Sequence, residues 1–186
     1  MTKKLCLFFF CSFFTASRIA QPPQFYKLVD ERVSAVSLGL HLPVGEFSST
    51  HFGGFGAEYT SARRWYGKIR LARQLVFTYN GGLAYYFGKK EAVSGYDYDY
   101  PGYLFLHAFG GISYAPRRKR KLNINLTAGP GLGIYNGNSQ FNIGSKLEGS
   151  YFISRKISIG PGIILIKESG ANAIWSAALK GTYIFQ

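Results

Sequence analysis

Four charged side chains stand out because they interrupt stretches that otherwise hold apolar and small residues. Glu58, Lys146, Glu148 and Lys180 each alternate with apolar neighbours, so on extended strands they would project away from the apolar face. His107 occupies an equivalent position in another stretch. If these strands form one closed sheet, the charges share its interior, where they must pair. The pattern predicts either an ionic network that plugs the interior or a gated polar path through it.

Other chemical motifs are few. The three histidines are His41, His51 and His107, and none belongs to a His-x-x-x-His pair. Neither a Gly-x-Ser-x-Gly sequence nor a phosphate-binding loop is present. We expect His41 and His107 to make hydrogen bonds inside the fold. The sequence therefore predicts no catalytic, cofactor-binding or metal site, and no enzymatic activity.

A tyrosine-rich stretch, Ser94–Pro101, is the most distinctive candidate for an exposed loop. Tyrosines give a large contact area at low entropic cost, as they do in antibody paratopes. The aspartates between them would bind a divalent cation weakly, or bridge to surface polysaccharide through one. A mobile polar loop without a set function remains an alternative. The candidate interaction residues are Tyr96, Asp97, Tyr98, Asp99 and Tyr100.

Composition leaves two broad classes of protein. The chain has 186 residues, with 22 Lys+Arg against 9 Asp+Glu and a formal net charge of +13. Aromatic residues make up 17% of the chain, which is too many for a disordered polyelectrolyte. A basic chain rich in glycine and tyrosine is either a nucleic-acid binder or an exported all-β protein.

The N-terminal segment favours export. A basic start precedes the apolar run Leu5–Phe14, which is too short to span a bilayer as a helix, and the small residues Thr15, Ala16, Ser17 and Ala20 follow. We expect a signal peptide at residues 1–20 and a mature domain at residues 21–186. Cys6 and Cys11 both lie in the signal segment, so the mature chain would have no disulfide, thiolate zinc site or thiol nucleophile.

The remainder reads as eight stretches in which apolar and small residues alternate with period two. Most are about ten residues long, the length that a tilted strand needs to cross a hydrocarbon core. Their apolar faces begin at Val36, Phe55, Phe77, Leu104, Leu122, Phe141, Ile157 and Trp175. In the fourth stretch both faces contain apolar residues, and we assign Leu104, Leu106, Ala108 and Ile112 to the same side as the others.

Three features favour a membrane barrel over a soluble one. The second face is small and polar, which suits a narrow lumen; an even strand number returns both termini to one side; and aromatic residues gather near strand ends, as in barrel girdles. The sequence therefore predicts an all-β fold, an eight-stranded antiparallel up-and-down transmembrane β-barrel. A secreted soluble β-barrel that binds a small apolar ligand is the alternative. The expected girdles are Tyr85, Phe87, Tyr103, Tyr135, Phe141 and Trp175 at one end, and Tyr59, Trp65, Tyr66, Tyr114, Tyr151, Tyr183 and Phe185 at the other.

Basic residues concentrate in the turns expected at the periplasmic end, most densely in the run Pro116–Lys121. They either keep the turns solvated or attract anionic headgroups or a periplasmic partner. The run also matches a nucleic-acid patch, but aromatic residues here interleave with glycine and leucine, so we expect no nucleic-acid partner. Gly129-Pro130-Gly131 and Gly160-Pro161-Gly162 place proline within strands, and there we expect bulges or gaps in the hydrogen-bond ladder.

The complete pattern resembles small outer-membrane β-barrel proteins related to OmpX and the OmpA membrane domain. The C-terminal Lys180-Gly181-Thr182-Tyr183-Ile184-Phe185-Gln186 is similar to the signal read by the barrel assembly machinery, although Gln186 follows the terminal aromatic. The resemblance implies a location in the cell outer membrane, contact with its lipids and with that machinery, and a structural or surface-interaction role with an unknown ligand. An outer-membrane lipid hydrolase of the PagL type is a weaker alternative, since such enzymes place His and Ser two apart, and neither His51 nor His107 has that spacing.

Overall fold

The computed structural model describes residues 33–64, 75–93, 96–115, 121–168 and 172–185. The predicted signal peptide, Trp65, Tyr66 and most of the basic turn residues lie outside these ranges. Within the described residues, no helix is long and apolar enough to cross a membrane.

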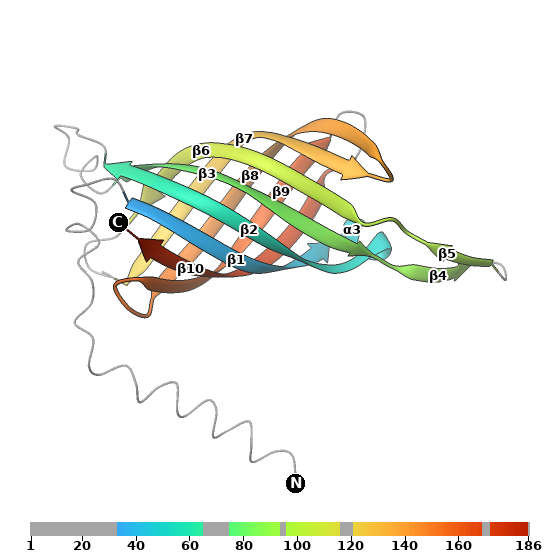
Figure 1. Ribbon diagram of the computed structural model, residues 1–186, viewed down its shortest axis with the longest axis horizontal. Helices are drawn as coiled ribbons and strands as arrows, with labels where there is room; N and C mark the ends of the chain where they lie inside the picture. The colour runs from blue at the N-terminus through green and yellow to red at the C-terminus, as the bar shows by residue number, and fades with distance from the viewer. Residues whose placement is uncertain (1–32, 65–74, 94–95, 116–120, 169–171, 186) are drawn as a thin grey trace, which may run out of the picture.

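Eight long strands form a closed barrel in which each strand pairs antiparallel with its neighbours, and β1 pairs with β10 to close the sheet (Figure 1). This confirms the predicted fold class. The barrel strands are β1 (Val33–Val44), β2 (His51–Arg64), β3 (Leu75–Gly88), β6 (Tyr103–Tyr114), β7 (Leu122–Tyr135), β8 (Asn138–Phe152), β9 (Ile157–Glu168) and β10 (Ile174–Phe185).

The start of β1 and the end of β10 lie at the same end of the barrel, because Ser34 pairs with Phe185. We call this the inner end, and the opposite one, which carries the longest connection, between β3 and β6, the outer end. The outer connections contain three short elements: α3 (Phe47–Thr50), β4 (Lys90–Val93) and β5 (Tyr96–Asp99). Since β4 pairs with β5, the tyrosine-rich segment that we predicted as a loop is half of a β-hairpin.

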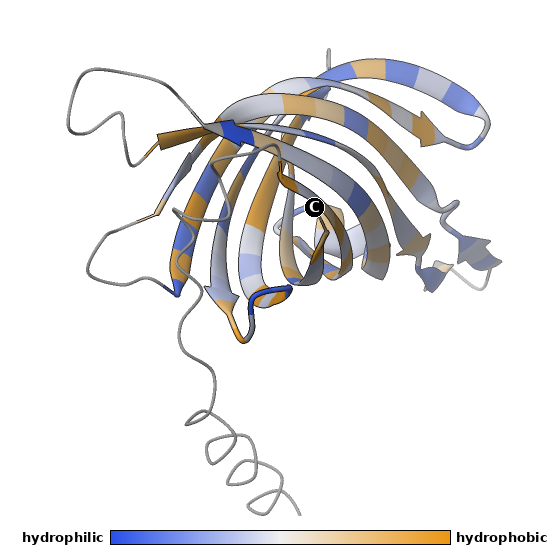
Figure 2. Ribbon diagram, turned by 60° about the vertical axis from the view of Figure 1, so that its left-hand side comes forward, coloured by the Kyte–Doolittle hydropathy of each residue, from blue (hydrophilic) through white to orange (hydrophobic). Residues whose placement is uncertain are grey.

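The apolar face of each barrel strand points outward. Figure 2 shows how hydrophobic and hydrophilic residues alternate along the strands. Leu38, Leu40, Leu126, Ile143 and Leu179 are all exposed, although each lies in the middle of a strand. Apolar side chains thus cover the outside while charged ones lie within. A soluble barrel that holds an apolar ligand would have the opposite arrangement.

One prediction about the two faces was wrong. Tyr103, which we placed in the outer girdle, is buried in the lumen together with Phe105 and Phe109. These residues share a face with His107, because alternate residues of β6 point inward. The lumen is therefore not uniformly small and polar. Its outer half is filled by an apolar cluster of Ala84, Tyr86, Tyr103, Phe105, Phe109, Ile164 and Ile166.

At Pro130 and at Pro161, the hydrogen-bond ladder to one of the two neighbouring strands is interrupted, as predicted. The β6–β7 pairing skips from His107–Gly131 to Gly110–Ala128, next to Pro130. The β8–β9 pairing skips from Glu148–Gly162 to Tyr151–Ile159, next to Pro161. In each case the register is the same before and after the interruption, so the sheet has a gap there and not a bulge.

Candidate functional site

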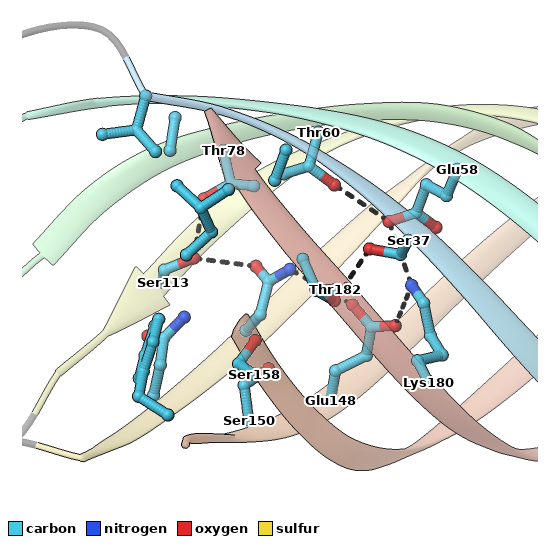
Figure 3. A pocket seen from close by; sticks show the side chains of 17 residues that line it. Ser37, Glu58, Thr60, Thr78, Ser113, Glu148, Ser150, Ser158, Lys180 and Thr182 are labelled. Atoms are coloured by element: carbon cyan, nitrogen blue, oxygen red, sulfur yellow. Dashed lines mark hydrogen bonds and ion pairs between the residues drawn. The ribbon is translucent and has the colours of Figure 1, made fainter. Parts of the chain in front are cut away.

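The charged residues singled out from the sequence meet in the middle of the lumen. Glu58 projects from β2, Lys146 and Glu148 from β8, and Lys180 from β10, so three strands that are not neighbours in the sheet contribute to one cluster. Inward positions on opposite walls of a closed barrel can face each other in this way. Figure 3 shows Glu58, Glu148 and Lys180 close together at one side of a cavity.

Each lysine contacts both glutamates, so the four groups form a closed ring of alternating charge. Lys146 Nζ contacts a carboxylate oxygen of Glu58 and lies 3.3 Å from Glu148 Oε2. Lys180 Nζ lies 3.1 Å from Glu58 Oε1 and 2.5 Å from Glu148 Oε1. We call these four residues the charge ring. Its two positive and two negative charges cancel.

The charge ring is withdrawn from water. The exposed fraction of the Lys146 side chain is 0%, and that of the Glu58 side chain is 7%. His107 Nε2 lies 3.2 Å from Glu58 Oε2 and so joins the ring to the sixth strand, β6. The His107 ring also packs against Phe105 and Phe109, at centroid distances of 5.4 and 4.6 Å. Through His107, the charge ring abuts the apolar cluster of the outer half.

On the inner side of the ring, the lumen holds small polar residues, a second group of buried apolar residues that includes Val33, Phe152 and Ile184, and a cavity of about 80 Å³. A chain of hydrogen bonds crosses this region from Thr78 to Ser113 at 2.6 Å, from Ser113 to Asn125 at 3.0 Å, and from Asn125 to Glu148 at 3.4 Å. Ser37 and Thr182 make a further bond of 2.9 Å (Figure 3). The ring and the apolar cluster lie between this cavity and the outer end.

The five candidate surface residues lie in and beside β5, in a hairpin that extends beyond the barrel (Figure 1). Lys90 Nζ donates to Asp99 at 3.1 Å, and the Tyr100 hydroxyl donates to Glu91 at 3.3 Å, so polar contacts join the two arms. Desolvation and the Glu91 carboxylate raise the pKa of the Tyr100 phenol, which keeps it a neutral donor. Asp97 and Tyr98 remain exposed.

Sequence reasoning missed a group of aromatic residues at the outer mouth of the barrel, where Phe47 of α3, His51 and Tyr103 lie together. Phe47 lies in a connection without periodicity, so no pattern marked it. Among the described residues, no group of three or more His, Cys, Asp or Glu side chains is arranged to hold a metal ion.

A closed eight-stranded sheet, an apolar exterior and a packed lumen with charged residues at its centre define a small transmembrane β-barrel of the outer-membrane type. The outer-membrane protein Ail of Yersinia pestis, determined in a phospholipid bilayer nanodisc, has a similar fold, with a TM-score of 0.57 at 11% sequence identity over 83% of this chain and 100% of that chain. The N-terminal β-barrel domain of Pseudomonas aeruginosa OprF gives a TM-score of 0.51 at 11% identity, over 83% and 97%.

The outer-membrane enzyme PagL also shares the fold, with a TM-score of 0.50 at 13% identity over 80% of this chain and 98% of that chain. No family model and no curated protein matches the sequence. At such low identities the likeness shows the fold alone, and this fold serves both enzymes and other proteins. The apolar exterior of the chain, together with that fold, places the barrel in the outer membrane.

Proposed function

We propose that this protein is a non-enzymatic outer-membrane barrel that binds a partner at the cell surface through the β4–β5 hairpin. The observation that carries the proposal is the hairpin itself, which extends β3 and β6 beyond the barrel and exposes Asp97, Tyr98 and Asp99. Exposed tyrosine with flanking polar groups is the composition of surfaces that bind proteins.

The hairpin is organised before any partner arrives. The register aligns Lys90 with Asp99 and Glu91 with Tyr98, and the Tyr98 and Tyr100 rings meet edge to face at 4.8 Å. Since these contacts already order the side chains, binding would forfeit less conformational entropy than it would in a flexible loop. The barrel serves in this proposal as the rigid base of the hairpin.

The lumen supports a second part of the proposal, that the barrel does not conduct ions. The charge ring fills the centre, and the apolar cluster covers it from the outer side. We expect purified protein in planar bilayers to give no steady channel current. A reproducible open state would contradict this part and favour a gated path through the ring.

Adhesion of intact cells tests the surface role. Bacteria that carry the protein are allowed to settle on surfaces coated with fibronectin, laminin or collagen, and are compared with cells that carry the empty vector. We expect Tyr98→Ser to lower adhesion about tenfold, as the loss of an aromatic hot spot does. Tyr151→Ser is the matched control, because Tyr151 is 45% exposed at the inner end, against 51% for Tyr98, and lies outside the C-terminal segment.

Adhesion equal to that of vector cells on all three coatings, or an equal effect of the two substitutions, would refute the hairpin as the binding surface. The competing activity is lipid hydrolysis, in keeping with the fold shared with PagL. Mass analysis of lipid A from cells with and without the protein tests it. We expect identical spectra, and the loss of an acyl chain would replace our proposal with an enzymatic one.

A further inference from the structure

A separate pocket opens at the outer mouth of the barrel, above the apolar cluster. Its volume is about 370 Å³, and its lining includes Phe47, His51, Tyr103, Tyr135 and Glu168. This volume lies within the range of small-molecule sites, roughly 300–1,000 Å³. The hairpin residues proposed above as the surface site do not line it.

Aromatic rings supply much of its wall. Phe47 and His51 lie at a centroid distance of 4.3 Å, tilted by 32°. Tyr103 lies 5.7 Å from Phe47 and 6.4 Å from His51, and Tyr135 lies 6.2 Å from His51. The four rings come from α3, β2, β6 and β7, and all four residues line the pocket. Aromatic faces carry negative potential, which favours a cation between them.

The pocket also holds a carboxylate. Glu168 Oε1 accepts a hydrogen bond from the Tyr103 hydroxyl at 2.6 Å, so its partner is a neutral group that leaves the negative charge in place. Gly133 makes room for this pair, because a Cβ atom there would lie 2.7 Å from Glu168 Oε1. A negative charge beside several aromatic rings is complementary to an organic cation.

Hydrogen bonds hold His51 and α3 in position in the wall of the pocket. His51 Nδ1 lies 2.8 Å from Thr50 Oγ1. Pro101 lies nearby, but among the described residues no group completes a hydrogen bond to the buried Nε2. Burial of His51 favours the neutral ring over the charged one. Lys89 Nζ donates to the Ser48 carbonyl at 2.5 Å and anchors α3, which carries Phe47.

We propose that this pocket binds a quaternary ammonium group, of which choline is the simplest biological example. A nitrogen with four alkyl substituents has no N–H to satisfy, so it needs aromatic faces and a nearby negative charge more than a set of hydrogen-bond acceptors. A metal ion is a poorer fit, because Glu168 is the single carboxylate among the described residues that line the pocket. The group would come from free choline or from a phosphocholine headgroup, and the experiment below separates these sources.

The test is calorimetric titration of the purified full chain with choline chloride. The detergent must be a maltoside, since amine-oxide and phosphocholine detergents carry a group resembling the ligand. We expect saturable binding with a Kd of about 1 mM or tighter. The neutral isostere 3,3-dimethyl-1-butanol, in which carbon replaces the charged nitrogen, should bind at least about tenfold more weakly. Equal binding of the two compounds, or no saturable binding of choline, would overturn the proposal.

Variants assign the binding to this pocket. Glu168→Gln and Tyr135→Leu should each weaken choline binding about fivefold, because they remove the charge and one aromatic face. Glu91→Gln and Phe141→Leu are the matched controls: both residues are exposed, and neither lines the pocket. Heat-modifiable gel migration checks that every variant folds. A control that weakens binding as much as the pocket variants would overturn the assignment.

Repeating the titration in nanodiscs distinguishes the sources. If the ligand is a lipid headgroup, phosphatidylcholine discs should lower the apparent affinity for added choline, relative to phosphatidylglycerol discs. If free choline is the ligand, the affinities in the two kinds of disc should agree. Either result supports the pocket and assigns its source.

Discussion

The charge ring makes a quantitative prediction about folding stability. Replacing Lys146 by methionine keeps the shape of the side chain but removes one of the two cations that separate Glu58 and Glu148. Lys180 is then the one lysine of the charge ring left to pair with both carboxylates, in a site where their exposed fractions are 7% and 10%. Removing one partner of a buried ion pair costs roughly 3–5 kcal/mol. We expect Lys146→Met to lower the free energy of unfolding by that amount.

The second substitution restores the balance of charge. In the double variant Lys146→Met/Glu58→Gln, Glu148 and Lys180 remain as a neutral pair at 2.5 Å. The double variant should therefore be more stable than Lys146→Met alone, even though it carries one more change. Lys90→Met is the control, because its ion pair with Asp99 is exposed, with side-chain exposures of 83% and 63%. We expect that control to cost about 1 kcal/mol or less.

The assay is unfolding in denaturant from lipid vesicles, followed by the shift of the folded band on gels and analysed by linear extrapolation. The reasoning is refuted if Lys146→Met is no more destabilising than Lys90→Met. It is also refuted if the double variant loses as much stability as the sum of its two single substitutions, because the charges would then act independently.

Two further predictions concern the barrel wall. Leu126→Arg places a charge on the apolar exterior, where Leu126 is 52% exposed and pairs with Ile112 and Leu147. We expect it to lower the free energy of unfolding by about 2–4 kcal/mol in the same assay. An unchanged stability would contradict a lipid-facing exterior. Gly82→Ala should cost about 1–3 kcal/mol, since the new Cβ would lie 2.5 Å from the Ala57 carbonyl oxygen and 3.0 Å from Glu58 Cα. Gly181→Ala, where nothing lies within 4 Å, should change stability by about 0.5 kcal/mol or less, so equal effects at the two glycines would argue against the packing described here.

Alternation was enough to predict the barrel and the inward direction of its charges. The side-chain period of a strand is two, so the parity of Glu58, Lys146, Glu148 and Lys180 relative to their apolar neighbours fixes which face each occupies. The contacts between these four side chains could not be predicted from the sequence. Glu58 and Lys146 are 88 positions apart, and which residues meet across the lumen depends on the register of every intervening strand.

Alternation could not indicate which side chains point into the lumen where both faces of a strand are apolar. In β6, Leu104, Leu106 and Ile112 alternate with Tyr103, Phe105 and Phe109, so hydropathy gave no reason to place the larger aromatic rings inside. The outer pocket was also hidden, because its walls come from α3, a short connection without periodicity, and from strand ends remote from it in sequence.

The central claim is that the apolar faces contact lipid. Brominated lipids quench the fluorescence of tryptophans that touch acyl chains, so a single tryptophan replaces Leu126 after Trp65→Phe and Trp175→Phe remove the others. We predict strong quenching at position 126 by lipids brominated along the chain, and little at a comparison tryptophan that replaces Asp97 in the hairpin. Equal quenching at the two positions, or stronger quenching in the hairpin, would contradict a membrane-spanning barrel.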